Sequence, residues 1–310
     1  MEHLGLGWVL LAGTLAGTLA ASSTREQDPG PIREKAMDMA QNSFDDQYQD
    51  CRCEMKEELI KVNRTEFENP LYADTWRKAD KRWQKSIDLQ VLRWEYAVAV
   101  LAYTYPTSLY LKFNAAVREG GRSREHYLEC FHFKTLHFLL TEALHTLRNA
   151  QGHRCYNVYR GVRGIRFTAR RHQTVRFGQF ASASLQGNAA QKFGQDTFFI
   201  VYTCYGVPIK LFSFFPREDE VLIPPYEVFK VTKFTRDRDR NVIHLRSHGV
   251  RSTYNCALLN STDSQQGGYH REMGTALGRR RRAPRAPPAM AAEERGPRAT
   301  GSVRGRGASW

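Results

Sequence analysis

The chain has 310 residues and a formal net charge of +14, but half of this excess lies in its last 32 residues, Arg279–Trp310. That segment holds nine Arg and two Glu in sequence rich in Ala, Gly and Pro. It has almost no large apolar side chains to offset its ordering entropy by burial, which excludes it from a folded core. We therefore expect a disordered Arg-rich tail over residues 263–310 and a single buried domain over residues 31–262.

The N-terminal residues predict export from the cell. Residues 4–20 are apolar or small throughout and are followed by Ala21, Ser22 and Ser23. This pattern is typical of a cleaved secretory signal over residues 1–20, although residues 1–3 contain no Lys or Arg. An uncleaved membrane anchor is the alternative. Because no apolar run of ~10–20 residues ends the chain, we expect no glycolipid anchor and predict a secreted or granule-stored protein without a membrane span.

The cysteines and two glycosylation sequons agree with secretion. The six cysteines are Cys51, Cys53, Cys130, Cys155, Cys204 and Cys256. In an oxidising compartment they could form three disulfides, in any of about fifteen connectivities. Metal binding is the alternative, but Cys51 and Cys53 are closer in sequence than zinc ligands usually are. The sequons begin at Asn63 and Asn260, and each is a weak signal by itself.

The first half of the domain has a helical pattern. After a Pro- and Gly-containing linker, a helix is expected to begin over Glu34–Met39, and residues 73–150 look helical. The clearest helix is Ser123–Arg148, in which Leu136, Leu140, Leu144 and their neighbours form one apolar stripe. The histidines of this region are His132, His137 and His145. Their spacing does not match the i, i+4 pairs of helical zinc sites, so no metal is expected.

Beyond Gly152 the pattern changes to short strands broken by Gly, Pro or Asp. The expected strands are Tyr156–Tyr159, Gly164–Phe167, Thr174–Ser184, Thr197–Cys204, Pro208–Phe215, Tyr226–Phe234 and Asn241–Arg246. Helices come first and strands later, without βαβ alternation. The sequence therefore predicts an α+β fold, with a mainly helical lobe over residues 31–150 packed on a mostly antiparallel, β-rich part over residues 151–262.

An acidic triplet, Glu218-Asp219-Glu220, stands between aromatic and aliphatic residues where a loop would normally carry Gly, Ser or Asn. In an extended segment Glu218 and Glu220 would share a face, roughly 6.6 Å apart at Cα, with Asp219 pointing away. Like charges this close raise at least one pKa, which suits acid-base or cation-stabilising chemistry. An edge strand protected by charge is the alternative.

Two further segments could bind an anionic ligand. Arg160 offers paired guanidinium donors for a phosphate, and Gly161 beside it would let the backbone approach the ligand. On the expected strand near residue 180, Phe180, Ser182 and Ser184 share one face. The chain has no Gly-x-Gly-x-x-Gly fingerprint or Walker loop, and neither Ser lies in a Gly-x-Ser-x-Gly frame. A nucleotide would therefore have to be held in another way, and a hydrolase nucleophile is not indicated.

Together, the Arg, the Phe-x-Ser-x-Ser segment and the Glu-x-Glu pair resemble the R-S-E-x-E signature of arginine-specific mono-ADP-ribosyltransferases. The resemblance covers most of the domain. It includes Phe44–Tyr48, Phe131–His137, Val175–Phe180 and the stretch that ends at Glu220. The chain is identified as a member of the vertebrate ecto-ADP-ribosyltransferase family, most similar to avian members.

The resemblance implies a split β-sandwich with a helical lobe and a set of site residues. By this resemblance, Arg160 would hold the phosphates of NAD, Ser182 would orient the catalytic acid Glu220, and Glu218 would confer arginine as the acceptor. Gln179, Ser213 and Tyr103 match positions that line the NAD pocket. The disulfides implied by the family join Cys51 to Cys256 and Cys155 to Cys204, which leaves Cys53 and Cys130 over.

The implied activity is transfer of ADP-ribose from NAD, or from NADP, to arginine side chains of acceptor proteins or to small guanidino compounds, without a metal. An NAD glycohydrolase that uses water as acceptor is one alternative. A secreted, non-enzymatic protein that binds polyanions through its Arg-rich tail is another. Unlike several members of the family, the chain ends in polar sequence rather than in a glycolipid-anchor signal.

Overall fold

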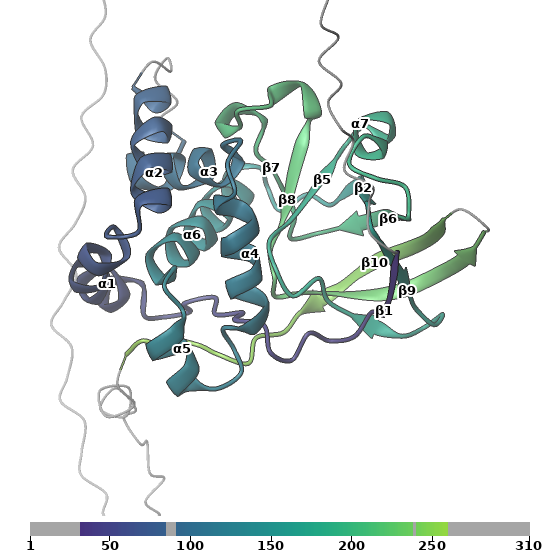
Figure 1. Cartoon of the computed structure of the whole chain (residues 1–310), viewed down its shortest axis with the longest axis horizontal. Helices are drawn as coiled ribbons and strands as arrows, with labels where there is room; N and C mark the ends of the chain where they lie inside the picture. The colour runs from purple at the N-terminus through teal and green to yellow at the C-terminus, as the bar shows by residue number, and fades with distance from the viewer. Residues whose placement is uncertain (1–31, 85–90, 238–239, 260–310) are drawn as a thin grey trace, which may run out of the picture. The chain divides into compact units, whose positions relative to one another are not determined.

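The computed structural model describes residues 32–84, 91–237 and 240–259, so the predicted signal, the Asn260 sequon and the Arg-rich tail lie outside the described residues. Helices make up the first half of the described chain and strands the second (Figure 1). The helices of the first half are α1 (Arg52–Glu66), α2 (Pro70–Trp83), α3 (Trp94–Thr104), α4 (Leu109–Glu119), α5 (Arg124–Cys130) and α6 (Lys134–Ala150). Apart from one short strand at residues 33–36, which precedes α1, the predicted order of helices before strands is confirmed.

The strands form one eight-stranded sheet and one two-stranded sheet. The larger has the order β4-β9-β10-β6-β2-β5-β8-β7, and β1 pairs with β3 in the smaller. Their bounds are β1 (Arg33–Ala36), β2 (Tyr156–Val162), β3 (Ile165–Thr168), β4 (Thr174–Val175), β5 (Ala181–Ser184), β6 (Thr197–Thr203), β7 (Val207–Pro208), β8 (Glu220–Ile223), β9 (Glu227–Arg236) and β10 (Asn241–Val250). The large sheet is antiparallel except where β10 runs parallel to β6. The predicted α+β class is therefore confirmed.

The short helix α7 (Gly187–Gln191) and the 3-10 turns η1 (Lys210–Phe212) and η2 (Pro216–Glu218) connect strands near the β2 and β8 side of the sheet.

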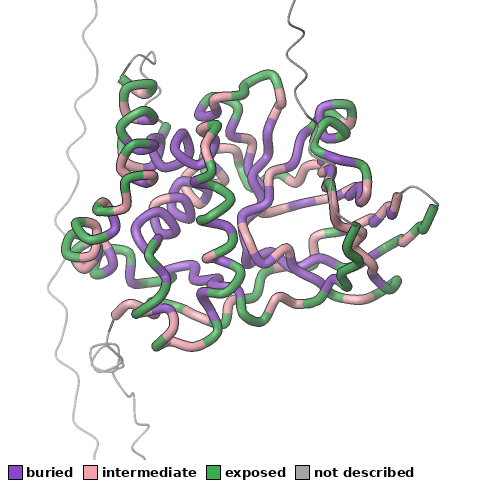
Figure 2. The backbone as a smooth tube through the Cα atoms, in the orientation of Figure 1, coloured by how far each residue is buried: buried purple, intermediate pink, exposed green. Residues whose placement is uncertain are grey.

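Two apolar clusters hold the domain together. The larger joins α3, α6 and their neighbours to Phe180, β7 and β8, and the smaller fills one face of the sheet. Every residue of α3 from Tyr96 to Thr104 is buried, because no charged side chain follows Glu95 in this helix. Figure 2 shows this pattern, with α3 and α6 largely buried and the outer turns of α1 and α2 exposed.

The predicted single helix Ser123–Arg148 is wrong, because α5 ends at Cys130 and α6 begins at Lys134. The new N-terminus is capped by Glu66 of α1, whose carboxylate accepts hydrogen bonds from the backbone N–H groups of Lys134 and Thr135. His137 is fully buried, and its ring nitrogens contact Tyr48 Oη at 2.7 Å and the carbonyl oxygen of Phe44 at 3.2 Å. Only tertiary contacts define this break.

Three further predicted elements differ in the structure. The expected helix at Glu34–Met39 is the strand β1, whose partner β3 lies far along the chain. Pro208–Phe215 contains only the end of β7 and the short turn η1, and Thr174–Ser184 is split into β4 and β5. The split includes Gly178, which has a positive φ of 67°. Periodicity cannot reveal such breaks, since they depend on partners distant in sequence.

Both disulfides implied by the family resemblance are present. Cys51 is bonded to Cys256 across 205 residues, and Cys155 to Cys204 across 49. The second bond joins the start of β2 to the end of β6, two strands that are also paired in the sheet. Cys53 and Cys130 are free and exposed.

A buried ion pair fixes the N-terminal segment to the sheet. Arg176 Nη1 donates to Asp45 Oδ2 at 2.5 Å, and both side chains are almost fully buried. The guanidinium also donates to the carbonyl oxygens of Met39, Ala40 and Arg251. The same Asp45 accepts the backbone N–H of Thr253 at 2.7 Å, so one carboxylate joins three segments that are distant in sequence.

Candidate active site

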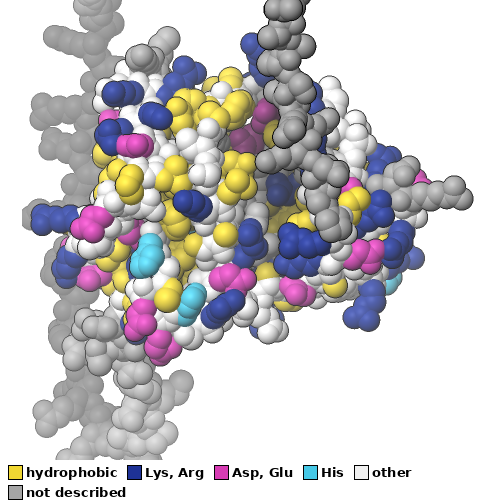
Figure 3. All heavy atoms as spheres, in the orientation of Figure 1, with side chains coloured by type: hydrophobic (Ala, Val, Ile, Leu, Met, Phe, Trp, Pro, Cys, Tyr) yellow, Lys and Arg dark blue, Asp and Glu magenta, His cyan; other side chains and the backbone are white. Residues whose placement is uncertain are grey.

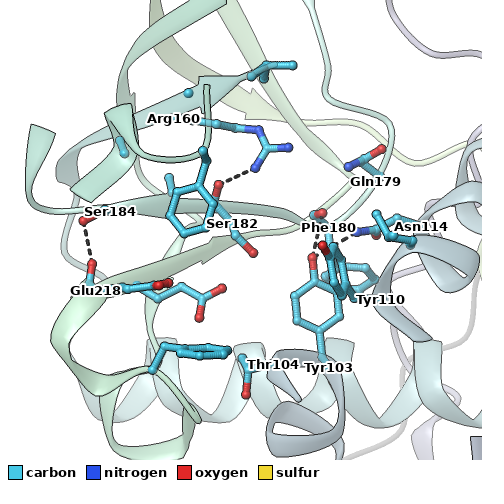
Figure 4. A pocket seen from close by; sticks show the side chains of 18 of the residues that line it. Tyr103, Thr104, Tyr110, Asn114, Arg160, Gln179, Phe180, Ser182, Ser184 and Glu218 are labelled. Carbon is cyan, nitrogen blue, oxygen red and sulfur yellow. Dashed lines mark hydrogen bonds between the residues drawn. The ribbon is translucent and has the colours of Figure 1, made fainter. Parts of the chain in front are cut away.

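A cavity of about 630 Å³ lies between the helical half and the sheet. Its helical wall comes from the end of α3 and from α4, and its sheet wall from β2, β5 and the segment that leads into β8. Figure 4 shows Tyr103 and Thr104 on one side of this space, Arg160 on the opposite side, and Glu218 between them. The volume is within the usual range for a small-molecule site.

Arg160 projects from β2 into the cavity. Its Nη1 donates to the carbonyl oxygen of Ser182 on the neighbouring strand at 2.5 Å. Burial lowers the pKa of Arg160, while Tyr103 and the carboxylate of Glu220 raise it. A guanidinium remains protonated under these conditions, so the sheet wall presents a fixed positive charge.

Glu218 and Glu220 both line the cavity, but they do not lie on one extended strand as predicted. Glu218 ends the turn η2, Asp219 has left-handed backbone angles of φ 44° and ψ 52°, and Glu220 begins β8. The predicted extended backbone from Glu218 to Glu220, and the Cα–Cα distance derived from it, are therefore wrong. Asp219 does point elsewhere, because its carboxylate binds Lys210 and Gln186.

Glu220 is an almost fully buried carboxylate. Ser213 Oγ donates to its Oε2 at 3.2 Å, and the Ser182 hydroxyl is a second hydrogen-bond partner. Burial is the largest influence and raises the pKa of Glu220; the two serines lower it, Glu218 raises it and Arg160 lowers it. Burial also raises the pKa of Glu218, against the effect of Lys192. A raised carboxylate pKa in a cavity is typical of functional sites.

Ser184 holds the turn that carries Glu218, a role that the sequence did not predict. Its Oγ donates to the backbone carbonyl oxygen of Glu218 at 2.5 Å and accepts from the backbone N–H of Gln186 at 2.9 Å. Ser184 is buried and pairs with Glu220 in the β5–β8 ladder. The alternating Ser-x-Ser pattern was the available signal, because it places both hydroxyls on one face of β5.

Of the three residues assigned to the NAD pocket by resemblance, two line the cavity. Tyr103 Oη donates to the carbonyl oxygen of Phe180 at 3.0 Å, and burial raises the pKa of Tyr103 to about 12. Gln179 is held by Arg118 from α4. Ser213 is not among the lining residues; it lies against Glu220, where its Oγ also accepts from the backbone N–H of Phe215 at 3.0 Å.

Gly161 lines the cavity. However, its neighbours show that glycine is needed here for packing of the chain, and not for close approach of a ligand. A Cβ at this position would lie 2.3 Å from the carbonyl oxygens of Ala190 and Gly194. The backbone of α7 and of the segment after it packs directly on β2 here. Gly161 therefore permits packing of the chain against itself.

Aromatic side chains at the cavity mouth were not predicted as site residues. Tyr105, Tyr110, Phe193 and Phe215 line the cavity, and the last three are exposed by 41%, 54% and 41%. Exposed rings around a concave site suit flat heterocycles. No periodic pattern marks them, because they come from four different segments.

Within residues 32–84, 91–237 and 240–259, no group of three or more His, Cys, Asp or Glu side chains could hold a metal ion. Among the same residues, no helix has the length and apolar character needed to cross a bilayer.

Comparison with known proteins gives consistent matches. The family model described as NAD:arginine ADP-ribosyltransferase matches residues 37–253. The chain is 56% identical over 283 residues to NAD(P)(+)--arginine ADP-ribosyltransferase 2 of Gallus gallus, covering 89% of this chain and 90% of that protein. It is 48% identical to GPI-linked NAD(P)(+)--arginine ADP-ribosyltransferase 1 of Homo sapiens, covering 77% and 79% of the two chains.

Solved structures give the same result. The crystal structure of the eukaryotic mono-ADP-ribosyltransferase ART2.2 matches with a TM-score of 0.62 and 38% identity, covering 71% of this chain and 98% of that one. A mutant of ART2.2 in complex with NADH matches with a TM-score of 0.61.

Proposed function

The chain belongs to the NAD:arginine ADP-ribosyltransferase family, and from this premise we propose that the cavity between α3 and β2 is where it binds and cleaves NAD. The activity is transfer of ADP-ribose from NAD(P) to arginine. We assign the catalytic roles to Arg160, Ser182, Glu218 and Glu220. The observation that supports this assignment is that all four line one cavity of about 630 Å³ although they come from three separate segments.

Glu220 stabilises the positive charge that develops on the sugar. Cleavage of the bond between nicotinamide and ribose passes through an oxocarbenium-like state, as in glycoside hydrolysis. A carboxylate fixed beside the reacting carbon lowers the energy of that state without having to reorganise. The hydroxyls of Ser182 and Ser213 fix the orientation of Glu220.

Glu218 acts on the acceptor. A guanidinium is protonated near neutral pH and is a poor nucleophile, so a second carboxylate must orient it and take its proton as the new bond forms. Glu218 is half-buried at the cavity and also lines an outer groove together with Lys192 and Arg217. An acceptor arginine can therefore reach Glu218 from solvent while the sugar lies on the inner side.

Arg160 binds the phosphates of NAD, and the aromatic rings at the mouth contact its bases. A guanidinium can donate two parallel hydrogen bonds to a phosphate group. Gln179 and Tyr103 line the same wall and complete the polar contacts. NADP is accepted in the same way, as the names of the relatives indicate for those proteins.

The test compares two conservative variants in two assays. We expect Glu220→Gln to abolish both nicotinamide release and ADP-ribose transfer to agmatine, a small guanidino acceptor. Glu218→Gln should abolish transfer and retain part of the nicotinamide release. Retention of transfer in either variant would contradict the assignment, whereas a wild-type protein that releases nicotinamide without modifying agmatine would instead be a glycohydrolase.

Arginine-containing acceptors are the partners of this activity, and the two disulfides are typical of an extracellular protein. Some relatives are GPI-linked by name. We propose that this chain is released in soluble form, with residues 31–262 as its single catalytic domain. Its recovery from the medium of expressing cells, without phospholipase treatment, is the measurement that tests release. Contact of the tail, residues 263–310, with polyanions stays a prediction from composition.

A further inference from the structure

Charge is divided unequally between the two halves of the domain. Residues 32–150 contain 18 Lys and Arg and 18 Asp and Glu, whereas residues 151–259 contain 17 Lys and Arg against 7 Asp and Glu. The helical half is therefore neutral and the β-rich half carries +10. In Figure 3, dark blue side chains gather over the end of the domain that carries β1, β9 and β10.

Several of these cations share one face of the large sheet. Lys230 of β9 lies directly opposite Arg246 of β10, and Arg246 lies beside Tyr202 of β6. Paired residues of neighbouring strands point to the same face. Their sequence neighbours Val231 and Leu245 are buried in the sheet core, so Lys230 and Arg246 point outward. One row of cations thus crosses neighbouring strands.

The turn between β3 and β4 extends this row. The backbone N–H of His172 donates to the carbonyl oxygen of Val231 at 2.8 Å, which holds the turn against β9. Arg170 and Arg171 of the turn line a cleft of about 620 Å³ together with Lys233. We call the outward surface formed by Arg170, Arg171, Lys230, Lys233 and Arg246 the basic face.

The positive charges of the basic face are not neutralised by nearby carboxylates of the described chain. Its five cations are exposed, and no ion pair among the described residues joins any of them to a carboxylate. Like charges directly opposite each other in a sheet are unfavourable. The Arg246 guanidinium lies 4.9 Å from the ring centroid of Tyr202, which orders it at the surface. A bound polyanion would remove the repulsion between Lys230 and Arg246.

We propose that the basic face binds a sulfated polysaccharide chain. On the sheet, Lys230 and Arg246 lie on adjacent strands, about 5 Å apart at the usual strand spacing, and the turn with Arg170 and Arg171 continues the charge beside β9, which suits an extended, regularly charged polymer. Among β6, β9 and β10, Val250 at the end of β10 is the one exposed large hydrophobic residue, which gives little support for insertion into a lipid surface. The disulfides are typical of the extracellular space, where sulfated glycans are abundant polyanions. None of the five cations lines the catalytic cavity, so binding leaves it open.

The test uses the full-length protein and a fluorescein-labelled heparin octasaccharide, with affinity measured by anisotropy across a salt series. We expect the double variant Lys230→Thr, Arg246→Thr to bind on the order of tenfold more weakly, with a salt dependence reduced by about two released ions. Threonine keeps the β propensity of both strands. The matched control is Arg64→Gln, Lys81→Gln, which removes two exposed cations from the helical half and should retain wild-type affinity within about threefold.

The wild type, the strand variant and the control all carry the same Arg-rich tail. A difference in heparin affinity among them therefore reports on the basic face and not on the tail. Equal losses in the two double variants would show that net charge alone is responsible and would overturn the proposal. It would also be overturned if desulfated heparin, duplex DNA or anionic vesicles competed as well as heparin does. If the strand variant unfolds at a lower temperature than the control, Arg170→Ser, Arg171→Ser in the turn replaces it, with the same expected loss.

Discussion

Replacement of Ser184 by Ala should separate arginine transfer from NAD cleavage. The Ser184 hydroxyl makes two hydrogen bonds that fasten the Glu218 turn to β5, at 2.5 Å and 2.9 Å. Each bond contributes a net ~0.5–1.5 kcal/mol. Loss of both in Ser184→Ala should therefore destabilise the ordered conformation of the Glu218 turn by about 2 kcal/mol. That free energy corresponds to roughly 30-fold in rate. Glu220 should keep its place, because the ladder between β5 and β8 holds it through the backbone.

The assay measures kcat/KM for agmatine modification and, without acceptor, the rate of nicotinamide release. We expect the first to fall roughly 10- to 30-fold and the second by less than about threefold. Ser252→Ala is the matched control, since its hydroxyl also makes two hydrogen bonds, to Asp45 O at 2.7 Å and from Gln47 Nε2 at 2.8 Å, away from the cavity. The reasoning fails if Ser184→Ala lowers both rates equally, or if Ser252→Ala changes their ratio as much.

Three further predictions concern pH dependence and stability. Because the Ser213 hydroxyl lowers the raised pKa of Glu220, Ser213→Ala should raise that pKa further and move the acid limb of the activity profile toward higher pH; an unmoved limb would contradict this. Arg176→Met leaves Asp45 buried without its cation and should cost about 3–5 kcal/mol in urea unfolding, whereas a loss below about 1 kcal/mol would refute the structural role of the pair. Gly161→Ala places a Cβ against two backbone oxygens. It should lower the free energy of unfolding by about 1–3 kcal/mol and the melting temperature by several degrees; an unchanged melting temperature would mean that α7 can move away from β2 without loss of stability.

The sequence alone determined the fold class and named most of the polar residues that meet at the cavity. The change from helical to strand periodicity near Gly152 was correctly located, because it depends on local spacing of apolar residues. The motif residues Arg160, Ser182, Glu218 and Glu220 were named from their pattern, and all of them line the cavity. Chemistry that resides in residue type and short spacing is visible without coordinates.

Tertiary structure decided how these residues meet. The left-handed Asp219, and not an extended strand, brings Glu218 and Glu220 to one cavity, and Ser184 and Ser213 fix them through hydrogen bonds whose partners only the folded chain reveals. The break before α6 likewise depends on Glu66 from a distant helix. Such features arise where a buried contact between distant segments contributes more free energy than the intrinsic helix or strand propensity of the residues involved. They therefore cannot be predicted from the residues that are adjacent in sequence.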